Sequence, residues 1–146
     1  MKKLILTLSL VCVSVGVLKN KCTFIHQKAE ILKDNNSIEF TVTATMYNAS
    51  ENQCDADPLI TAGMYKINPH KASEHKWIAV SRDLLKRWGG KLTYGDKVRL
   101  KNAGHKSGIY KIVDTMNARF KNKIDILETK NTKLYKFENV TMIKIV

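Results

Sequence analysis

FTVTATMY, at residues 40–47, alternates apolar and polar side chains along its whole length. Successive side chains of a β-strand point to opposite faces, so this period of two is typical of a strand with one buried face. The apolar set, Phe40, Val42, Ala44 and Met46, would face the core, and the residues between them would face the other side. The stretch therefore predicts a strand at the start of a β-rich domain.

Five further short strands follow along the chain, separated by segments rich in turn residues. They are expected at Trp77 to Val80, Lys97 to Lys101, Gly108 to Val113, Asn122 to Leu127 and Val140 to Val146. Both faces of the last strand are largely apolar, which predicts burial on both sides. Six short strands favour a small closed β-barrel, because closure removes exposed strand edges.

One short helix and one long loop complete the expected fold. Residues 82–88 form a brief candidate helix, which Ser81 would cap and the glycine pair after it would end. Residues 48–76 are rich in Asn, Asp, Pro, Gly and His and predict a long loop region. The expected architecture is mainly β: a six-stranded barrel over residues 38–146 with one short helix.

The N-terminus has the pattern of a secretory signal peptide. Two lysines follow Met1, a mostly apolar run extends to Val13, and small residues at positions 14 and 16 mark a candidate cleavage site. The sequence thus predicts a signal peptide at residues 1–16, a lead-in or linker at 17–37, and a secreted, periplasmic or cell-envelope protein. An uncleaved anchor is the alternative, although the uncharged stretch is short for a membrane-spanning helix.

The composition is that of a globular protein with a strong excess of positive charge. Lysine and arginine outnumber the acids by 25 to 13, which gives a net charge of +12 and indicates an anionic partner. Nucleic acid is the alternative partner, and the export signal argues against it. Three cysteines are too few for a disulfide scaffold, and their spacing does not resemble a structural zinc site. If residues 1–16 are removed, Cys22 and Cys54 remain and would either form a disulfide or stay as two thiols.

Two aspartates in apolar strands are the candidate catalytic groups. Asp114 ends the strand that begins at Gly108, and Asp125 lies between Ile124 and Ile126. A carboxyl group withdrawn from water has a raised pKa and is suited to donate a proton. Strand alternation also allows a plainer interpretation, in which Asp125 faces water while its isoleucine neighbours face the core.

The polar segment between these aspartates offers candidate substrate-binding side chains. Asn117, Arg119 and Lys123 belong to this basic loop, which would either bind a polar ligand or form a solvated turn. Asp55 and Asp57 are candidate metal ligands, but an Asp-Pro step is more typical of a turn. The histidines show no paired ligand spacing. No metal and no cofactor are expected, and no nucleophile or phosphate-loop motif occurs.

Several of these segments together resemble the double-psi β-barrel domains of the three-aspartate and rare-lipoprotein-A-like group. The segments are TATMYN at 43–48, DPLITA at 57–62, IAVSRDLL at 78–85, YGDKV at 94–98, VDTMN at 113–117 and KIDIL at 123–127. The eleven-residue step from Asp114 to Asp125 matches the last two aspartates of that family. Related barrels include those of the membrane-bound lytic transglycosylase A and the expansins. The resemblance extends over about residues 40–146.

The resemblance implies a double-psi barrel with a surface groove. In catalytic relatives the second aspartate of the pair is the acid, so Asp125 would take that role, and Asp114 would tune its pKa and orient the substrate. Thr45 and Tyr47, in the first matching segment, join the candidates for substrate binding.

The sequence also departs from the family pattern. The first family aspartate normally follows the Ala-Val strand, but Ser81 occupies that place here, with Asp83 two residues later. Asp83 is therefore a candidate substitute for that aspartate and a candidate substrate-binding residue. The typical Gly-Gly after Asp-Thr is replaced by Met116-Asn117, so the chain is expected to be a divergent member.

The resulting hypothesis is a secreted enzyme that cleaves peptidoglycan glycan strands without water, as lytic transglycosylases do. Asp125 would protonate the glycosidic oxygen while the muramic C6 hydroxyl attacks C1, a route that needs one acid rather than the carboxylate pair of a hydrolase. The alternatives are a non-catalytic, expansin-like polysaccharide binder and an inactive structural barrel. The expected partner is peptidoglycan or another anionic cell-wall glycan, and the protein is expected to be a monomer.

Overall fold

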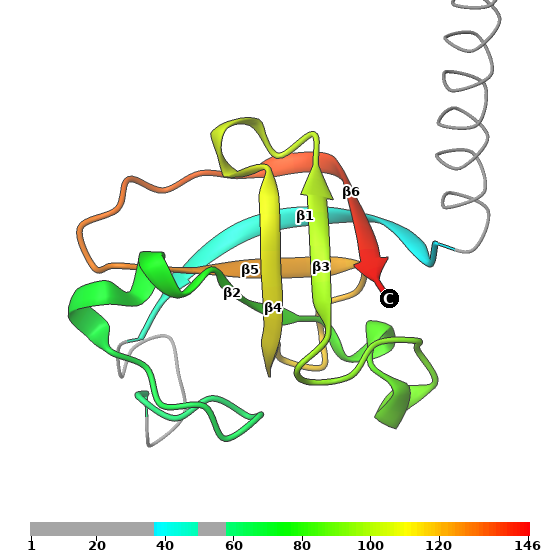
Figure 1. The fold of residues 1–146 in the computed structure, drawn as a ribbon, viewed down its shortest axis with the longest axis horizontal. Coiled ribbons are helices and arrows are strands. Elements are labelled where there is room, and N and C mark those ends of the chain that lie inside the picture. Colours follow the sequence, from blue (N-terminus) through cyan, green and yellow to red (C-terminus); the bar gives the residue numbers. More distant parts are fainter. Residues whose placement is uncertain (1–36, 50–57) are drawn as a thin grey trace, which may run out of the picture. The chain divides into compact units, whose positions relative to one another are not determined.

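The computed structural model describes residues 37–49 and 58–146 of the chain (Figure 1). Its strands are β1 (Glu39–Asn48), β2 (Trp77–Val80), β3 (Lys97–Lys101), β4 (Gly108–Thr115), β5 (Lys123–Glu128) and β6 (Phe137–Ile145). They form a closed barrel in the order β1-β5-β2-β4-β3-β6, and β6 pairs with β1. The mainly β, six-stranded barrel that the sequence predicts is confirmed.

The barrel contains both parallel and antiparallel pairs, and this mixture positions the candidate site. β5 runs parallel to β1, and β4 runs parallel to β2, whereas β2 and β5 are antiparallel to each other. Strands that follow each other in sequence are therefore often separated in the barrel. The two strands that carry the candidate aspartates, β4 and β5, both lie next to β2.

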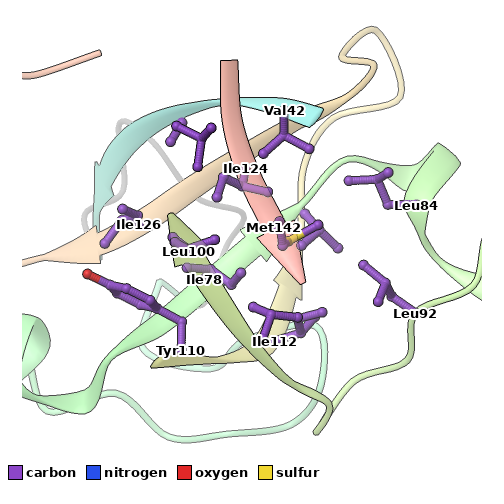
Figure 2. Packing of buried hydrophobic residues seen from close by; sticks show 14 of the residues in the cluster. Val42, Ile78, Leu84, Leu92, Leu100, Tyr110, Ile112, Ile124, Ile126 and Met142 are labelled. Atoms are coloured by element: carbon purple, nitrogen blue, oxygen red, sulfur yellow. The ribbon is translucent and has the colours of Figure 1, made fainter. Parts of the chain in front are cut away.

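Apolar side chains from the strands fill the barrel interior. Figure 2 shows Ile78, Ile112, Ile124 and Met142 meeting there from β2, β4, β5 and β6. All four are fully buried. Burial of such apolar side chains is the main favourable contribution to folding.

The last strand is buried on one face only, so the prediction of burial on both faces is wrong. Val140 and Met142 of β6 point into the barrel, whereas Ile143 is half-buried and Ile145 is exposed. In a closed barrel, interior positions alternate with exterior positions along every strand. The pattern of β6 is misleading because apolar residues also occupy its exterior positions.

A second apolar cluster, here called the outer cluster, lies outside the barrel against β2 and β5. It consists of Tyr47, Ile67, Ala72, Ala79, Met116 and Leu127, with Ala49, Trp77 and Phe120 packed against it. Part of its cover comes from the segment before β2, where Ile60 bridges to Lys66 and the 3-10 helix η1 (Pro69–His75) buries Ala72. The described part of the predicted loop thus packs on the barrel and shields its outer face.

The predicted helix after β2 is instead a pair of 3-10 turns. They are η2 (Arg82–Leu84) and η3 (Lys86–Trp88), and Leu85 between them is extended. Leu85 bridges to Leu92, whose N–H donates to the Leu84 carbonyl at 2.9 Å. These bonds replace those of a continuous helix. They also let two consecutive leucines be buried, although a helix would point them in different directions.

Several predictions concern residues outside the described ranges. They are the signal peptide at 1–16, nearly all of the lead-in at 17–37, the cysteines at positions 12, 22 and 54, and the aspartates at 55 and 57. The compact unit that contains the barrel runs from Ile38 to Val146. In the part of the chain that the structure describes, no helix is both long and apolar enough to cross a membrane.

Candidate functional site

Asp114 and Asp125 belong to one row of residues that crosses four strands. The register pairs Thr45 of β1 with Asp125 of β5, Asp125 with Ala79 of β2, and Ala79 with Asp114 of β4. These four residues are called the acid row below. Adjacent strands lie ~4.8 Å apart, so the Cα atoms of the two aspartates are separated by roughly 10 Å, with Ala79 between them.

Asp125 lies on the exterior of the barrel, because Ile124 and Ile126 on either side of it are buried in the interior. The carboxyl group is nevertheless partly buried. Its register partner Ala79 and its same-face neighbour Leu127 both belong to the outer cluster. The plainer interpretation from the sequence is thus correct for the direction of the side chain, but not for its surroundings.

Burial raises the pKa of Asp125 above the ordinary value of a carboxyl group. Two neighbours oppose this shift: the Thr45 hydroxyl donates a hydrogen bond to the Asp125 Oδ1 atom, and the charge of Lys123 favours the ionised form. Burial outweighs both. Within the described residues nothing hydrogen-bonds the Oδ2 atom, so this oxygen is free to hold the proton.

Both carboxylate oxygens of Asp114 accept hydrogen bonds from other residues of the chain. Its Oδ1 atom accepts hydrogen bonds from the N–H groups of Ala62 at 3.0 Å and Thr115 at 2.8 Å, and the Tyr47 hydroxyl donates to Oδ2 at 3.4 Å. The bond from Ala62 fastens the bridged segment at residues 60–66 to the end of β4. Asp114 therefore positions part of the cover of the outer cluster.

The two β1 residues that are predicted to bind substrate contact the aspartates. Thr45 holds Asp125, and Tyr47 reaches Asp114. Only 8% of Tyr47 is exposed, which leaves little of its ring for a substrate. In this structure both residues orient the acid row.

Asp83 and Ser81 fasten the end of β2 to the start of β5. The Asp83 Oδ2 atom accepts from the Asn122 N–H at 3.0 Å, and its Oδ1 atom is buried with no partner in the described part of the chain. Ser81 is fully buried, and its hydroxyl accepts from the Lys123 N–H at 3.1 Å instead of capping the turn that follows. Asp83 thus lies in the turn after β2 and is not part of the acid row, which passes through Ala79 within β2.

The loop between β4 and β5 carries the remaining predicted binding residues. Asn117 is exposed, and its side-chain oxygen accepts from the Arg119 N–H at 3.1 Å, which tightens the turn. The Arg119 guanidinium and the Lys123 ammonium lie 4.8 and 5.1 Å from the Phe120 ring centroid. Phe120 packs against the outer cluster, which also contains Ala79 and Leu127, the neighbours of Asp125. The loop is therefore held close to Asp125.

The sequence did not predict the group of residues around the end of β4, which consists of Tyr94, Thr115, Arg82 and Arg87. Burial raises the pKa of the Tyr94 hydroxyl, against the hydrogen bond with Thr115 and the charges of Arg87 and Arg82. These side chains come from segments that meet only through the strand order of the barrel. No motif or spacing in the sequence signals their proximity.

Among the described residues, no group of three or more His, Cys, Asp or Glu side chains is placed to hold a metal ion. No family model, no curated protein and no solved structure matches the chain. The candidate site therefore depends on its own geometry and on the residue patterns of the sequence.

Proposed function

We propose that this chain is a secreted cell-wall protein whose barrel, of the double-psi type, cleaves peptidoglycan glycan strands in the manner of a lytic transglycosylase. The observation that supports this most is Asp125, a partly buried exterior carboxyl group with a raised pKa and one oxygen held by Thr45. A general acid must carry its proton near the working pH, and these surroundings favour that form. The pattern of residues 1–16 supports export.

The proposed reaction uses one acid twice. Asp125 gives its proton to the glycosidic oxygen as the bond from that oxygen to C1 breaks, and the leaving sugar departs with a free hydroxyl group. The C6 hydroxyl of the muramic residue attacks C1, and its proton returns to the Asp125 carboxylate. The acid is regenerated, an anhydro-sugar forms, and no water is consumed.

Asp114 would support this reaction from two strands away. Its bonds to Ala62 and Tyr47 hold side chains and backbone at the border of the acid row. A substrate strand that crosses the acid row would meet this border beside the reacting bond. Asp114 is thus a positioning residue in the proposal.

A non-catalytic, expansin-like binder of peptidoglycan or another polysaccharide is the second candidate. It is favoured by the separation of the two aspartates, since Ala79 lies between them and Asp114 is engaged by its own chain. A binder needs only an exterior surface that fits the polymer, whereas an enzyme also needs Asp125 to transfer a proton.

Digestion of isolated sacculi separates the two candidates. The soluble products are read by mass spectrometry, and sedimentation of the protein with the sacculi is measured in parallel. Wild type should release anhydro-muropeptides, Asp125→Asn should release none, and Asp114→Asn should lose most of the activity. Glu138→Gln, on the exposed face of β6, is the matched control and should keep full activity.

The two assays give distinct outcomes. Folded Asp125→Asn that keeps wild-type turnover would show that Asp125 is not the acid. Sedimentation of wild type with sacculi without any soluble product would favour the binder. A thermal unfolding curve for each variant shows whether lost activity reflects lost folding.

A further inference from the structure

Cationic side chains gather at the end of the barrel where β2 ends and β5 begins. Arg82 and Arg87 belong to the turns after β2, and Arg119 and Lys123 belong to the loop before β5 and to its first residue. The two segments are joined because the Ser81 N–H donates to the Lys123 carbonyl at 2.9 Å. Asp83 also lies at this junction, so the four cations outnumber the carboxylate there.

Two of these cations share one aromatic ring. The guanidinium carbons of Arg82 and Arg87 lie 5.3 and 5.2 Å from the Trp88 ring centroid, and these two residues are called the arginine pair below. Stacking on an aromatic face restricts a guanidinium group but leaves its N–H donors for other partners. Trp88 is 40% exposed and Arg87 is also exposed, whereas Arg82 is partly buried.

The arginine pair has no carboxylate of its own in the described part of the chain. Two other partly buried cations are paired with carboxylates: Lys106 lies 2.6 Å from Glu128, and Lys144 lies 2.7 Å from Asp96. Lys111 instead lies over the Tyr65 ring, 4.1 Å from its centroid, as the arginines lie over Trp88. The Arg82 Nε atom, by contrast, is buried and has no hydrogen-bond partner among the described residues. The arginine pair is thus held by stacking, and the exposed Arg87 is the member whose guanidinium N–H groups can reach an external anion.

The arginine pair also lies close to the acid row. Arg82 is three residues after Ala79, and the Val80 carbonyl between them accepts hydrogen bonds from the Met116 N–H at 2.9 Å and the Thr115 hydroxyl at 3.3 Å. The turns that carry the arginine pair thus begin at the end of the strand that holds Ala79, beside the end of β4.

We propose that the arginine pair binds carboxylate groups of peptides attached to the glycan, so that the substrate is a peptide-bearing strand and not a bare one. This inference depends on the proposed function above. Guanidinium groups bind carboxylates through two parallel N–H···O bonds, and a neutral polysaccharide offers no such acceptor. The arginine pair then sets the position of the strand relative to Asp125.

Binding to three probes tests the inference. The probes are intact sacculi, sacculi whose carboxyl groups have been amidated, and soluble polyglutamate, which contains no glycan. The double variant Arg82→Gln/Arg87→Gln is compared with Lys97→Gln/Arg99→Gln, which removes the same charge from exposed positions of β3. Arg87→Gln alone, at an exposed position, is the second variant in case the first double variant unfolds.

The arginine double variant should lose about tenfold or more of the affinity for intact sacculi and for polyglutamate. The β3 double variant should lose less than about twofold, because its charges are exposed and solvated. Amidated sacculi should bind wild type and the arginine variant equally weakly.

Three outcomes would overturn the inference: equal losses in both double variants, unchanged binding by the arginine variants, or amidated sacculi that bind wild type as tightly as intact ones. Failure of the proposed function looks different. If wild type binds polyglutamate through the arginine pair but does not bind sacculi, the carboxylate site is supported and the cell-wall function is refuted.

Discussion

Replacing Glu128 by glutamine tests whether burial or contact distance decides the strength of an ion pair in this barrel. The pairs Lys106–Glu128 and Lys136–Glu138 have the same N–O distance of 2.6 Å. Their surroundings differ, because the side chain of Glu128 is 2% exposed and that of Glu138 is 66% exposed. The chain thus provides its own matched control.

The expected cost follows from what Glu128 holds together. Its carboxylate accepts hydrogen bonds from Ser73 at 2.5 Å and Tyr135 at 2.7 Å, in addition to the bond from Lys106. Removing one partner of a buried ion pair costs about 3–5 kcal/mol. Each kcal/mol lowers the Tm of a domain of this size by about 4 °C, so Glu128→Gln should lower it by about 12–20 °C. Glu138→Gln should leave the Tm unchanged.

The pH dependence gives an independent check. Burial opposes ionisation of Glu128, but Lys106, Ser73 and Tyr135 together outweigh it and hold the pKa of the carboxyl group below its ordinary value. A carboxyl group whose pKa is lowered by folding stabilises the fold above its unfolded pKa, about 4.3, and this contribution is lost as the pH falls through the folded pKa. The stability difference between wild type and Glu128→Gln should therefore be complete at pH 7 and shrink below about pH 4.

Urea unfolding of the three proteins at a series of pH values measures both effects. If Glu128→Gln and Glu138→Gln unfold at the same urea concentration at pH 7, burial does not decide the strength of these pairs. A difference that stays constant in acid would show that the carboxylate charge is not its origin.

Two further predictions concern the acid row and the turns that carry the arginine pair. Thr45→Val removes a hydrogen bond that lowers the pKa of Asp125, so the basic limb of the pH–activity profile should move to higher pH; an unmoved limb would contradict the assigned acid. Gly90→Ala should lower the Tm more than Gly89→Ala, because a Cβ at position 90 would lie 2.2 Å from the Leu84 carbonyl group, whereas position 89 has open space and only the strain of a φ of +92°. Equal Tm values for the two glycine variants would show that the turn adjusts to the added atom.

The positions of the strands could be predicted because they depend on local pattern. The strands Trp77–Val80 and Lys97–Lys101 have the bounds that the sequence indicates, since turn residues delimit each of them. The outward direction of Asp125 between two buried isoleucines follows from alternation in the same way. Closure into a six-stranded barrel could also be anticipated, because short strands otherwise leave exposed edges.

Other features required the tertiary structure, and their causes are long-range. Residues 82–88 form two 3-10 turns because Leu85 bridges to Leu92, a contact that helix propensity does not include. Ile143 and Ile145 on the exterior of β6 are not fully buried although they are apolar, because burial depends on which segments cover a face. The arginine pair could not be predicted either, because the stacking of Arg82 and Arg87 on Trp88 depends on how the two turns fold.

The sequence by itself determined the strand pattern, the basic charge and the two aspartates that deserve testing. Only the tertiary structure decided that Asp114 and Asp125 both pair with Ala79, because strand order and register arise from contacts between distant segments. It also decided the environment of Asp125. The outer cluster that borders this carboxyl group is assembled from separate parts of the chain, including Tyr47 and Met116, and the burial that raises its pKa exists only once these parts have come together.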